Sequence, residues 1–444
     1  MGGMACLPDT GAARAADKGP VPLQLPPLPL RQRRLANGLQ VISVADRSTA
    51  SVSVQMWYRV GSKDDPVGRS GFAHLFEHMM FKRTEHMPNE MFDRLTEDVG
   101  GQNNAFTAED MTVYQNEVPS NHLERLLWAE AERLAHLQVD QASFDSERKV
   151  VIEELRERVL ADPYGRLFNA MPAYGFEVHP YRRPGIGNEA ELNAATLDDV
   201  RRFHDTYYRP DNALLIVAGD FDPAQLDAWI DRYFGPLRTP SVPIPRVNVV
   251  EPPRARDIRA ALTAPNVPLP AVALLWKGPA ASHADAAALK VAAALLSSGD
   301  SSRLNEALVY RTQMAQTAGF SVDLYADAGQ LAAYAIAASG RALGTLETAL
   351  LAQIRRLATG RIDAAELDKV RTQLLTSMLS SRQTPQGQAD AIGQAVLLQG
   401  DAREADRLLL QVQAVQADDV RRVLATHLLK ARHVALEYTQ GAAQ

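Results

Sequence analysis

An internal repeat constrains the fold of this chain more than any other feature of its sequence. The run Asp198-Asp199-Val200-Arg201-Arg202 recurs further along the chain as Asp418-Asp419-Val420-Arg421-Arg422. Each run is followed by a short apolar stretch typical of a buried strand, at residues 213–218 and 434–438. Because both the motif and the order around it recur, the repeat indicates a duplicated domain.

A proline-rich segment separates the two copies. Five prolines lie between residues 239 and 255, where no long periodic pattern is present, so we expect a semi-rigid extended linker. The sequence therefore divides into an unstructured or leader-derived segment at 1–27, an N-terminal domain at 28–238 and a homologous C-terminal domain at 256–444. A length of 444 residues is suitable for such an arrangement.

The first copy alternates strand and helix patterns. Residues 51–57 alternate polar and apolar side chains, which predicts a half-buried strand. Strands are also predicted at 39–44, 112–118 and 213–218, and helices at 70–81, 122–136 and 144–160.

Bulk composition narrows the class of protein. The net charge of −6 argues mildly against nucleic acid or an anionic membrane surface as the main partner. No apolar run approaches the roughly 20 residues that a membrane-spanning helix needs, so we expect no membrane span. Cys6 is the only cysteine, which leaves the redox compartment undecided.

The N-terminal residues carry a weak targeting signal. Ala13-Arg14-Ala15 resembles the small-residue end of a secretory leader, but no charged and apolar segments precede it. Bacterial periplasm and cytoplasm both stay open as locations, with a slight preference for the periplasm.

The most specific motif is His74-Leu75-Phe76-Glu77-His78, within a predicted helix. Histidines four apart project from one helical face and can reach one tetrahedral zinc ion. Glu77 lies one turn from His74, where it can act as a base without ligating the ion. His-x-x-Glu-His is the inverzincin arrangement.

Catalytic zinc usually takes three protein ligands, so one more must come from elsewhere. The helix that begins near Phe144 offers Glu147, Glu153, Glu154 and Glu157. Glu147 and Glu154 share one face, but a helix this charged is more often simply solvated. Periodicity alone does not choose among the four.

Several motifs together resemble the M16 metallopeptidases, the group of pitrilysin, insulin-degrading enzyme and the mitochondrial processing peptidase. The resemblance runs through residues 58–62, 71–79, 104–107 and 147–154, and it is strongest in the first copy. It implies an α+β fold of two homologous domains, each an antiparallel sheet packed with helices, that face each other across a substrate chamber.

The resemblance also implies roles for individual residues. Glu154 would be the third ligand beside His74 and His78 of one zinc ion, and Glu147 would support the site from outside the ligand set. Glu77 would be the general base that takes a proton from the attacking water and passes it to the leaving amine. The strand at Asn104, Ala105 and Phe106 would bind an extended peptide substrate along its edge.

The second copy has no His-x-x-Glu-His motif. When Asp198 is aligned with Asp418, the segment from His74 to His78 falls on Ala294 to Ser298, and Glu154 falls on Leu374. The second copy is therefore expected to have no equivalent of this zinc site. The resemblance implies that it forms the wall that faces the active half and encloses the substrate.

This sequence also departs from the family pattern at an Arg/Tyr pair, which members of the family often place in this wall. Arg311 fits the arginine, but the tyrosine position is Ala318, or Gln316 if the loop is two residues shorter. Some bacterial members of the family divide the work between a zinc-bearing chain and a chain with the Arg/Tyr pair. A zinc-bearing chain without this tyrosine resembles the first kind, so we expect as partner a homologous M16 subunit that supplies an Arg/Tyr pair. The role of Arg311 stays open.

Two other functions compete with a zinc endopeptidase. A non-catalytic assembly subunit of the same family usually lacks a ligand or the base, and here all four residues are present. A zinc lyase that makes a quorum-signal precursor also uses His-x-x-Glu-His, but it takes a cysteine as third ligand, and Cys6 lies outside the predicted domains.

Overall fold

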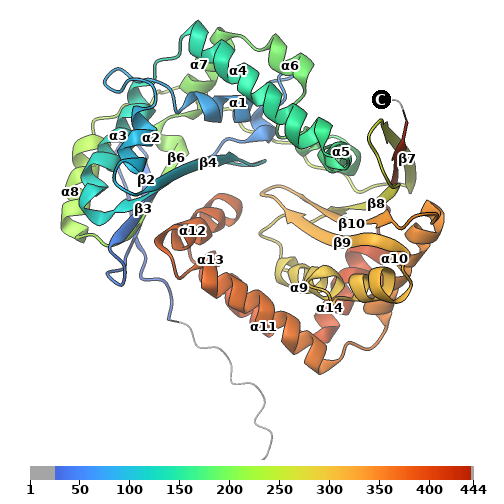
Figure 1. The fold of residues 1–444 in the computed structure, drawn as a ribbon. Coiled ribbons are helices and arrows are strands. Elements are labelled where there is room, and N and C mark those ends of the chain that lie inside the picture. Colours follow the sequence, from blue (N-terminus) through green and yellow to red (C-terminus); the bar gives the residue numbers. More distant parts are fainter. Residues whose placement is uncertain (1–25, 442–444) are drawn as a thin grey trace, which may run out of the picture.

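A computed structural model describes residues 26–441. Ala13-Arg14-Ala15, Cys6 and most of the predicted leader segment lie outside the described residues. Within them, no helix is long and apolar enough to cross a membrane. The chain forms two α/β halves, coloured blue to green and yellow to red along the sequence (Figure 1).

The first half contains a six-stranded sheet of order β1-β2-β6-β3-β5-β4. Its strands are β1 (Arg31–Arg34), β2 (Gln40–Ala45), β3 (Ser51–Tyr58), β4 (Gln102–Thr107), β5 (Thr112–Pro119) and β6 (Ala213–Gly219). Its helices are α1 (Phe72–Met79), α2 (Met91–Glu97), α3 (Leu123–His136), α4 (Gln141–Leu155), α5 (Gly165–Gly175), α6 (Glu189–Ala194), α7 (Leu197–Tyr207) and α8 (Pro223–Tyr233).

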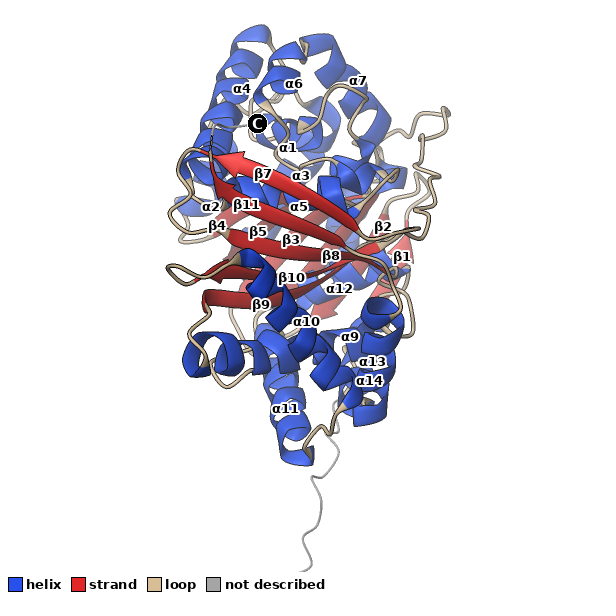
Figure 2. Ribbon diagram, turned by 90° about the vertical axis from the view of Figure 1, so that its right-hand side faces the viewer, coloured by secondary structure: helices blue, strands red, loops and turns tan. Residues whose placement is uncertain are grey.

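The second half contains a five-stranded sheet of order β7-β11-β8-β10-β9. Its strands are β7 (Ile258–Ala264), β8 (Ala271–Gly278), β9 (Ala315–Leu324), β10 (Gly329–Ala337) and β11 (Val434–Gln440). Its helices are α9 (Ala286–Ser297), α10 (Leu343–Thr359), α11 (Ala364–Ser381), α12 (Pro385–Gln399), α13 (Glu404–Ala414) and α14 (Ala417–Leu424). Figure 2 shows this sheet with its neighbouring helices.

Strand order shows the duplication directly. β2, β6, β3, β5 and β4 match β7, β11, β8, β10 and β9 in sequence order and in position within the sheet. The alignment of the two repeated runs also places both ends of β3 on the ends of β8. The predicted α+β fold with two sheets packed with helices is confirmed. Each sheet is antiparallel except for one parallel pair, β2 with β6 and β7 with β11.

The two halves exchange helices. α12 of the second half covers one face of the first sheet, where Ile392 and Val396 pack beside Trp57 and Ile216. Gly393 is needed there, because an added Cβ would lie 2.2 Å from the Trp57 ring. In return, α5 of the first half places Leu167 and Met171 against the second sheet.

This exchange changes the environment predicted for β3. The strand is buried on both faces rather than half-buried. Val52, Val54 and Met56 face the core of the first half. On the other face Gln55 donates a hydrogen bond of 2.9 Å to Asp390 of α12. The alternation does mark two different faces, but the polar face is covered by a helix that the second half contributes.

Polar contacts also join the halves at the hairpin loops. Lys63, just after β3, forms ion pairs with Asp110 (2.7 Å) and Asp327 (2.8 Å). Asp110 precedes β5 and Asp327 precedes β10, so the matching hairpins of the two halves meet at one lysine.

No helix or strand lies between Tyr233 and Ile258. The segment is nevertheless anchored. Glu251 accepts hydrogen bonds from the backbone N–H groups of Glu177, Val178 and His179 and pairs with Lys277 at 2.6 Å. Burial acts to raise the pKa of Glu251, but these bonds outweigh it and lower the pKa to about 2.

Candidate metal centre

Helix α1 carries the His-x-x-Glu-His motif, and its start is fixed by two residues before it. Gly71 has a left-handed φ of 85°, and an added Cβ would lie 2.5 Å from the Ile186 carbonyl oxygen. Asp65 accepts hydrogen bonds of 2.8 Å from the N–H groups of Gly71 and Ala73. These contacts hold the first turn, from which His74 projects, because they satisfy N–H groups that the helix leaves unpaired.

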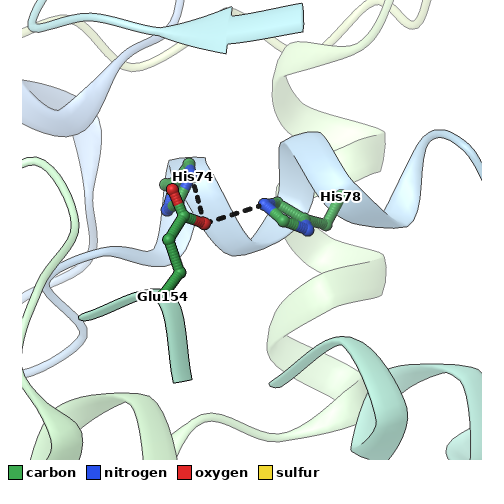
Figure 3. Close-up of side chains that lie close together, drawn as sticks. All are labelled: His74, His78 and Glu154. Carbon is green, nitrogen blue, oxygen red and sulfur yellow. Dashed lines mark ion pairs between the residues drawn. The ribbon is translucent and has the colours of Figure 1, made fainter. Parts of the chain in front are cut away.

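The structure brings the three residues proposed as ligands together (Figure 3). Oε2 of Glu154, on α4, lies 3.6 Å from Nε2 of His74 and 3.6 Å from Nε2 of His78. Zinc bonds of about 2.0–2.1 Å in a tetrahedron place ligand atoms roughly 3.4 Å apart. The observed separations are longer than hydrogen bonds and close to that edge. The donor set therefore fits zinc.

Glu147 lies one step further from the proposed ion. Its Oε2 is 3.4 Å from Nδ1 of His78, and its Oε1 is 2.7 Å from Nζ of Lys82. Burial acts to raise the pKa of Glu147, but the hydrogen bonds from His78 and Lys82 lower it. Glu147 is thus held as an anion where it can fix the ring orientation and tautomer of His78.

His74 is in a different electrostatic environment from His78. Burial, followed by the charges of His78 and Arg158, lowers the pKa of His74 to about 3. A neutral imidazole is the form that binds a metal. Burial also acts to lower the pKa of His78, but its hydrogen bond with Glu147 and the neighbouring carboxylates raise it.

Glu77 lies on α1 between the two histidines, and its side chain is nearly buried. Oε2 of Glu77 accepts a hydrogen bond of 2.6 Å from the Thr107 hydroxyl of β4. Burial raises the pKa of Glu77 to about 7, against the opposing effects of Thr107 and His78. Glu77 is not part of the His74–His78–Glu154 cluster, which leaves its carboxylate free to act on a proton.

Two contacts at the site were not predicted from the sequence. Arg158 binds Oε1 of Glu154 at 2.6 Å, so the second oxygen is left for the imidazoles. Its spacing of four residues from Glu154 was a usable signal. Thr107 is the last residue of the motif at residues 104–107, but the resemblance implied no role for it. Glu153, by contrast, pairs with Arg156 at the surface, and Glu157 is also exposed.

Asn104, Ala105 and Phe106 lie on β4, which is the edge strand of the first sheet. Asn104 and Phe106 are exposed, and the Phe106 ring packs edge-on against Trp57 at 6.1 Å. The Ala105 N–H donates to the Asn104 side-chain oxygen at 2.9 Å. The outer edge of β4 therefore has backbone groups with no neighbouring strand.

The matching positions of the second half line a cavity of about 890 Å³. In the alignment of the two repeated runs, Ala294, Ser297, Ser298 and Leu374 match His74, Glu77, His78 and Glu154, and none of these four is a metal-binding residue type at a ligand position. Arg311 is exposed, Gln316 is exposed on β9, and Ala318 is buried on the same strand.

Two imidazoles, a carboxylate between them and a second buried carboxylate form the arrangement of a metal-dependent hydrolase. Comparisons with known proteins agree with this class. Residues 40–189 match the family Insulinase (Peptidase family M16), and residues 194–374 match the Peptidase M16 inactive domain. The chain belongs to the M16 peptidase family.

Its relatives include named proteases. The chain is 30% identical over 392 residues to the zinc protease PqqE of Helicobacter pylori, which covers 88% of each chain. It is 25% identical to a probable mitochondrial-processing peptidase subunit beta of Arabidopsis thaliana, over 88% of this chain and 75% of the relative. A crystal structure of a protease from Helicobacter pylori matches with a TM-score of 0.89 and 29% identity, over 93% of this chain and 100% of that one.

Proposed function

We propose that this chain is a zinc-dependent endopeptidase and the catalytic subunit of a heteromeric M16 peptidase. The observation that carries the proposal is the position of Glu154, whose Oε2 lies 3.6 Å from both imidazole Nε2 atoms. Glu77, on the same helix as the histidines, stays outside this cluster and is hydrogen-bonded by Thr107. A scaffold subunit has no requirement for this combination.

The residues have distinct tasks in the proposed reaction. His74, His78 and Glu154 hold one zinc ion, which supplies Lewis acidity toward a water molecule and a peptide carbonyl. Glu77 takes a proton from the attacking water and later gives it to the leaving amine. Thr107 orients Glu77, Glu147 orients His78, and Arg158 orients Glu154.

The proposed substrate is a peptide or a small unfolded protein in extended conformation. β4 is an edge strand that reaches from the exposed residues Asn104 and Phe106 to Thr107, which contacts Glu77. A peptide that adds to this edge as a further strand would run past the general base. Recognition through backbone groups would accept many sequences.

The proposed partner is a homologous M16 subunit that supplies an Arg/Tyr pair, because this chain lacks the tyrosine. Ala318 is buried and Gln316 carries no phenol, so neither candidate position provides one. A relative of this chain is itself named a peptidase subunit. Arg311, which is exposed, keeps no assigned role in this scheme.

The test combines metal content with hydrolysis. The purified chain, alone and co-expressed with a homologous M16 subunit, is incubated with a peptide mixture that is read by mass spectrometry, with a chelator control. We expect one zinc ion at the His74 site, hydrolysis that increases with the partner, and a loss of about 10²–10⁴-fold in Glu77→Gln with zinc retained.

Two outcomes would contradict the proposal. Zinc binding without hydrolysis under either condition would indicate a non-catalytic assembly subunit. Full activity of the chain alone, unchanged by the partner, would remove the heteromeric part and leave the peptidase.

A further inference from the structure

A second group of metal-ligating side chains lies in the other half of the molecule. Among the residues that the structure describes, only two clusters place three such groups within ion-binding reach, and the second is His283, Asp285 and His427. Their candidate ligand atoms lie within 4.8 Å of one another. Oδ2 of Asp285 is 2.8 Å from Nε2 of His427 and 3.8 Å from Nδ1 of His283.

The duplication offers a control for the role of Asp285. Its counterpart in the first half, Asp65, uses both carboxylate oxygens to bind N–H groups at the start of α1. Asp285 lies closer to its helix, at the N-cap of α9, but its side chain makes no hydrogen bond to the helix backbone. The carboxylate is turned toward the two histidines instead, so helix capping does not account for its orientation.

The histidines themselves are specific to the second half. When the two repeated runs are aligned, His283 falls on Lys63 and His427 falls on Tyr207, and neither residue is a usual zinc ligand. The cluster is therefore no remnant of a feature that the two halves share.

The arrangement of groups parallels that of the first metal centre, but Oδ2 of Asp285 and Nε2 of His427 lie at hydrogen-bond distance, 2.8 Å, and must move apart to bind one ion. In each cluster an arginine binds one carboxylate oxygen, Arg158 on Glu154 and Arg422 on Asp285 at 2.7 Å, and the other oxygen faces two imidazoles. The imidazole rings lie edge to face in both, with centroids 5.0 Å apart for His74 and His78 and 6.0 Å apart for His283 and His427.

We propose that His283, Asp285 and His427 bind a second zinc ion, with water in the remaining coordination positions. Two imidazoles and a carboxylate are a donor set that zinc takes. The ion would join the start of α9 to the helical turn at Ala425–Leu429 (η7) and so tie down the second half.

Four features should make this ion bind more weakly than the ion at the first centre. The positive end of α9 and Arg422 both oppose a cation. His283 is half exposed. The Asp285 N–H also donates to Nδ1 of His283 at 3.1 Å, so this ring must exchange that bond for the ion or turn to present Nε2.

The test counts zinc ions on the full chain. Metal is removed by dialysis against a chelator, and zinc chloride is titrated in competition with a chromophoric chelator. We expect two ions on the native chain, the weaker at least tenfold below the stronger. His283→Ala and His74→Ala should each bind one ion, the first losing the weaker and the second losing the stronger.

His433→Ala is the matched control, because His433 also pairs with an aspartate, Asp257 at 3.4 Å, but has no second imidazole beside that pair. This variant should keep two ions. His283 is exposed enough that its removal should leave the fold intact, which circular dichroism of the metal-free protein checks.

Cobalt provides an independent readout. In the His74→Ala background, visible absorption bands of bound Co²⁺ should appear and should be lost when His427→Ala is added. A native chain that binds a single ion, or a His283→Ala variant that still binds two, would overturn the second site. Neither result bears on zinc at His74, His78 and Glu154, which the His74→Ala titration reports separately.

Discussion

The two halves of the molecule share a strand order and differ in the residues on one pair of helices. α1 presents His74, Glu77 and His78 to Glu154 of α4. At the aligned positions, the α9 and α11 region of the second half has Ala294, Ser297, Ser298 and Leu374. Ser297 donates to the backbone oxygens of Ala293 and Phe320, so its hydroxyl is satisfied inside the protein. The fold tolerates both sets of residues, and the chemistry depends on only a few side chains.

The largest expected effect follows from removal of the bridging carboxylate. Glu154→Gln keeps the side-chain size but removes the negative charge that faces both imidazoles, so zinc at this centre and peptidase activity should fall to background. Metal analysis and peptide hydrolysis measure both. Glu153→Gln, one residue away and paired with Arg156 at the surface, should change neither. Full zinc occupancy in Glu154→Gln would show that Glu154 is not a ligand that distinguishes the first half from the second.

A smaller effect is expected at the residue that orients His78. Glu147→Gln removes an anionic acceptor 3.4 Å from Nδ1 of His78 and should weaken zinc binding by about 10–100-fold. Competition with a chromophoric chelator measures the affinity. Glu157→Gln, exposed beyond the end of α4, is the control. An unchanged affinity would mean that Lys82 and Glu147 form only a structural ion pair.

The hydroxyl on β4 is expected to matter less again. Thr107→Val preserves shape but removes the hydrogen bond to Glu77, a bond to a carboxylate worth about 1.5 kcal/mol, which corresponds to a tenfold loss in kcat. Zinc content should stay constant. Ser297 is the residue of the second half that aligns with Glu77, and it provides the control. Ser297→Ala should leave kcat unchanged. A variant of Thr107 with native kcat would remove its proposed orienting role.

The smallest effect concerns stability rather than chemistry. Ile392→Val removes one methylene group from the contact of α12 with the first sheet and should lower the free energy of unfolding by about 0.5–1.5 kcal/mol. Urea denaturation measures it, with Val150→Ala on the exposed face of α4 as the control. Because each half donates a helix to the other, we expect a single transition. Two separate transitions would show that the halves fold independently.

Local patterns in the sequence predicted a good part of this structure. The helix expected at residues 70–81 is α1, and the strand expected at 39–44 is β2, within two residues at each end. The spacing of His74 and His78 also placed both rings on one face of α1. These features depend on the periodicity of apolar and polar residues over a short segment, and a single sequence displays that periodicity.

Long-range contacts were beyond the sequence. Periodicity left four glutamates as candidates, and only the family resemblance implied Glu154. The packing of α4 on α1 places Glu154 between the histidines. The burial of Trp57 under Gly393 likewise depends on a helix from the other half. Such contacts follow from tertiary packing, for which local propensity contains no information.

The exchange of α5 and α12 has a consequence for the connection between the halves. Each sheet is completed by a helix that belongs to the opposite side of the linker, and Glu251 fastens the linker itself to the first half. A protease that cuts near the exposed Val242 would therefore nick the chain without separating it. The two fragments would remain interlocked and would migrate together until a denaturant released them.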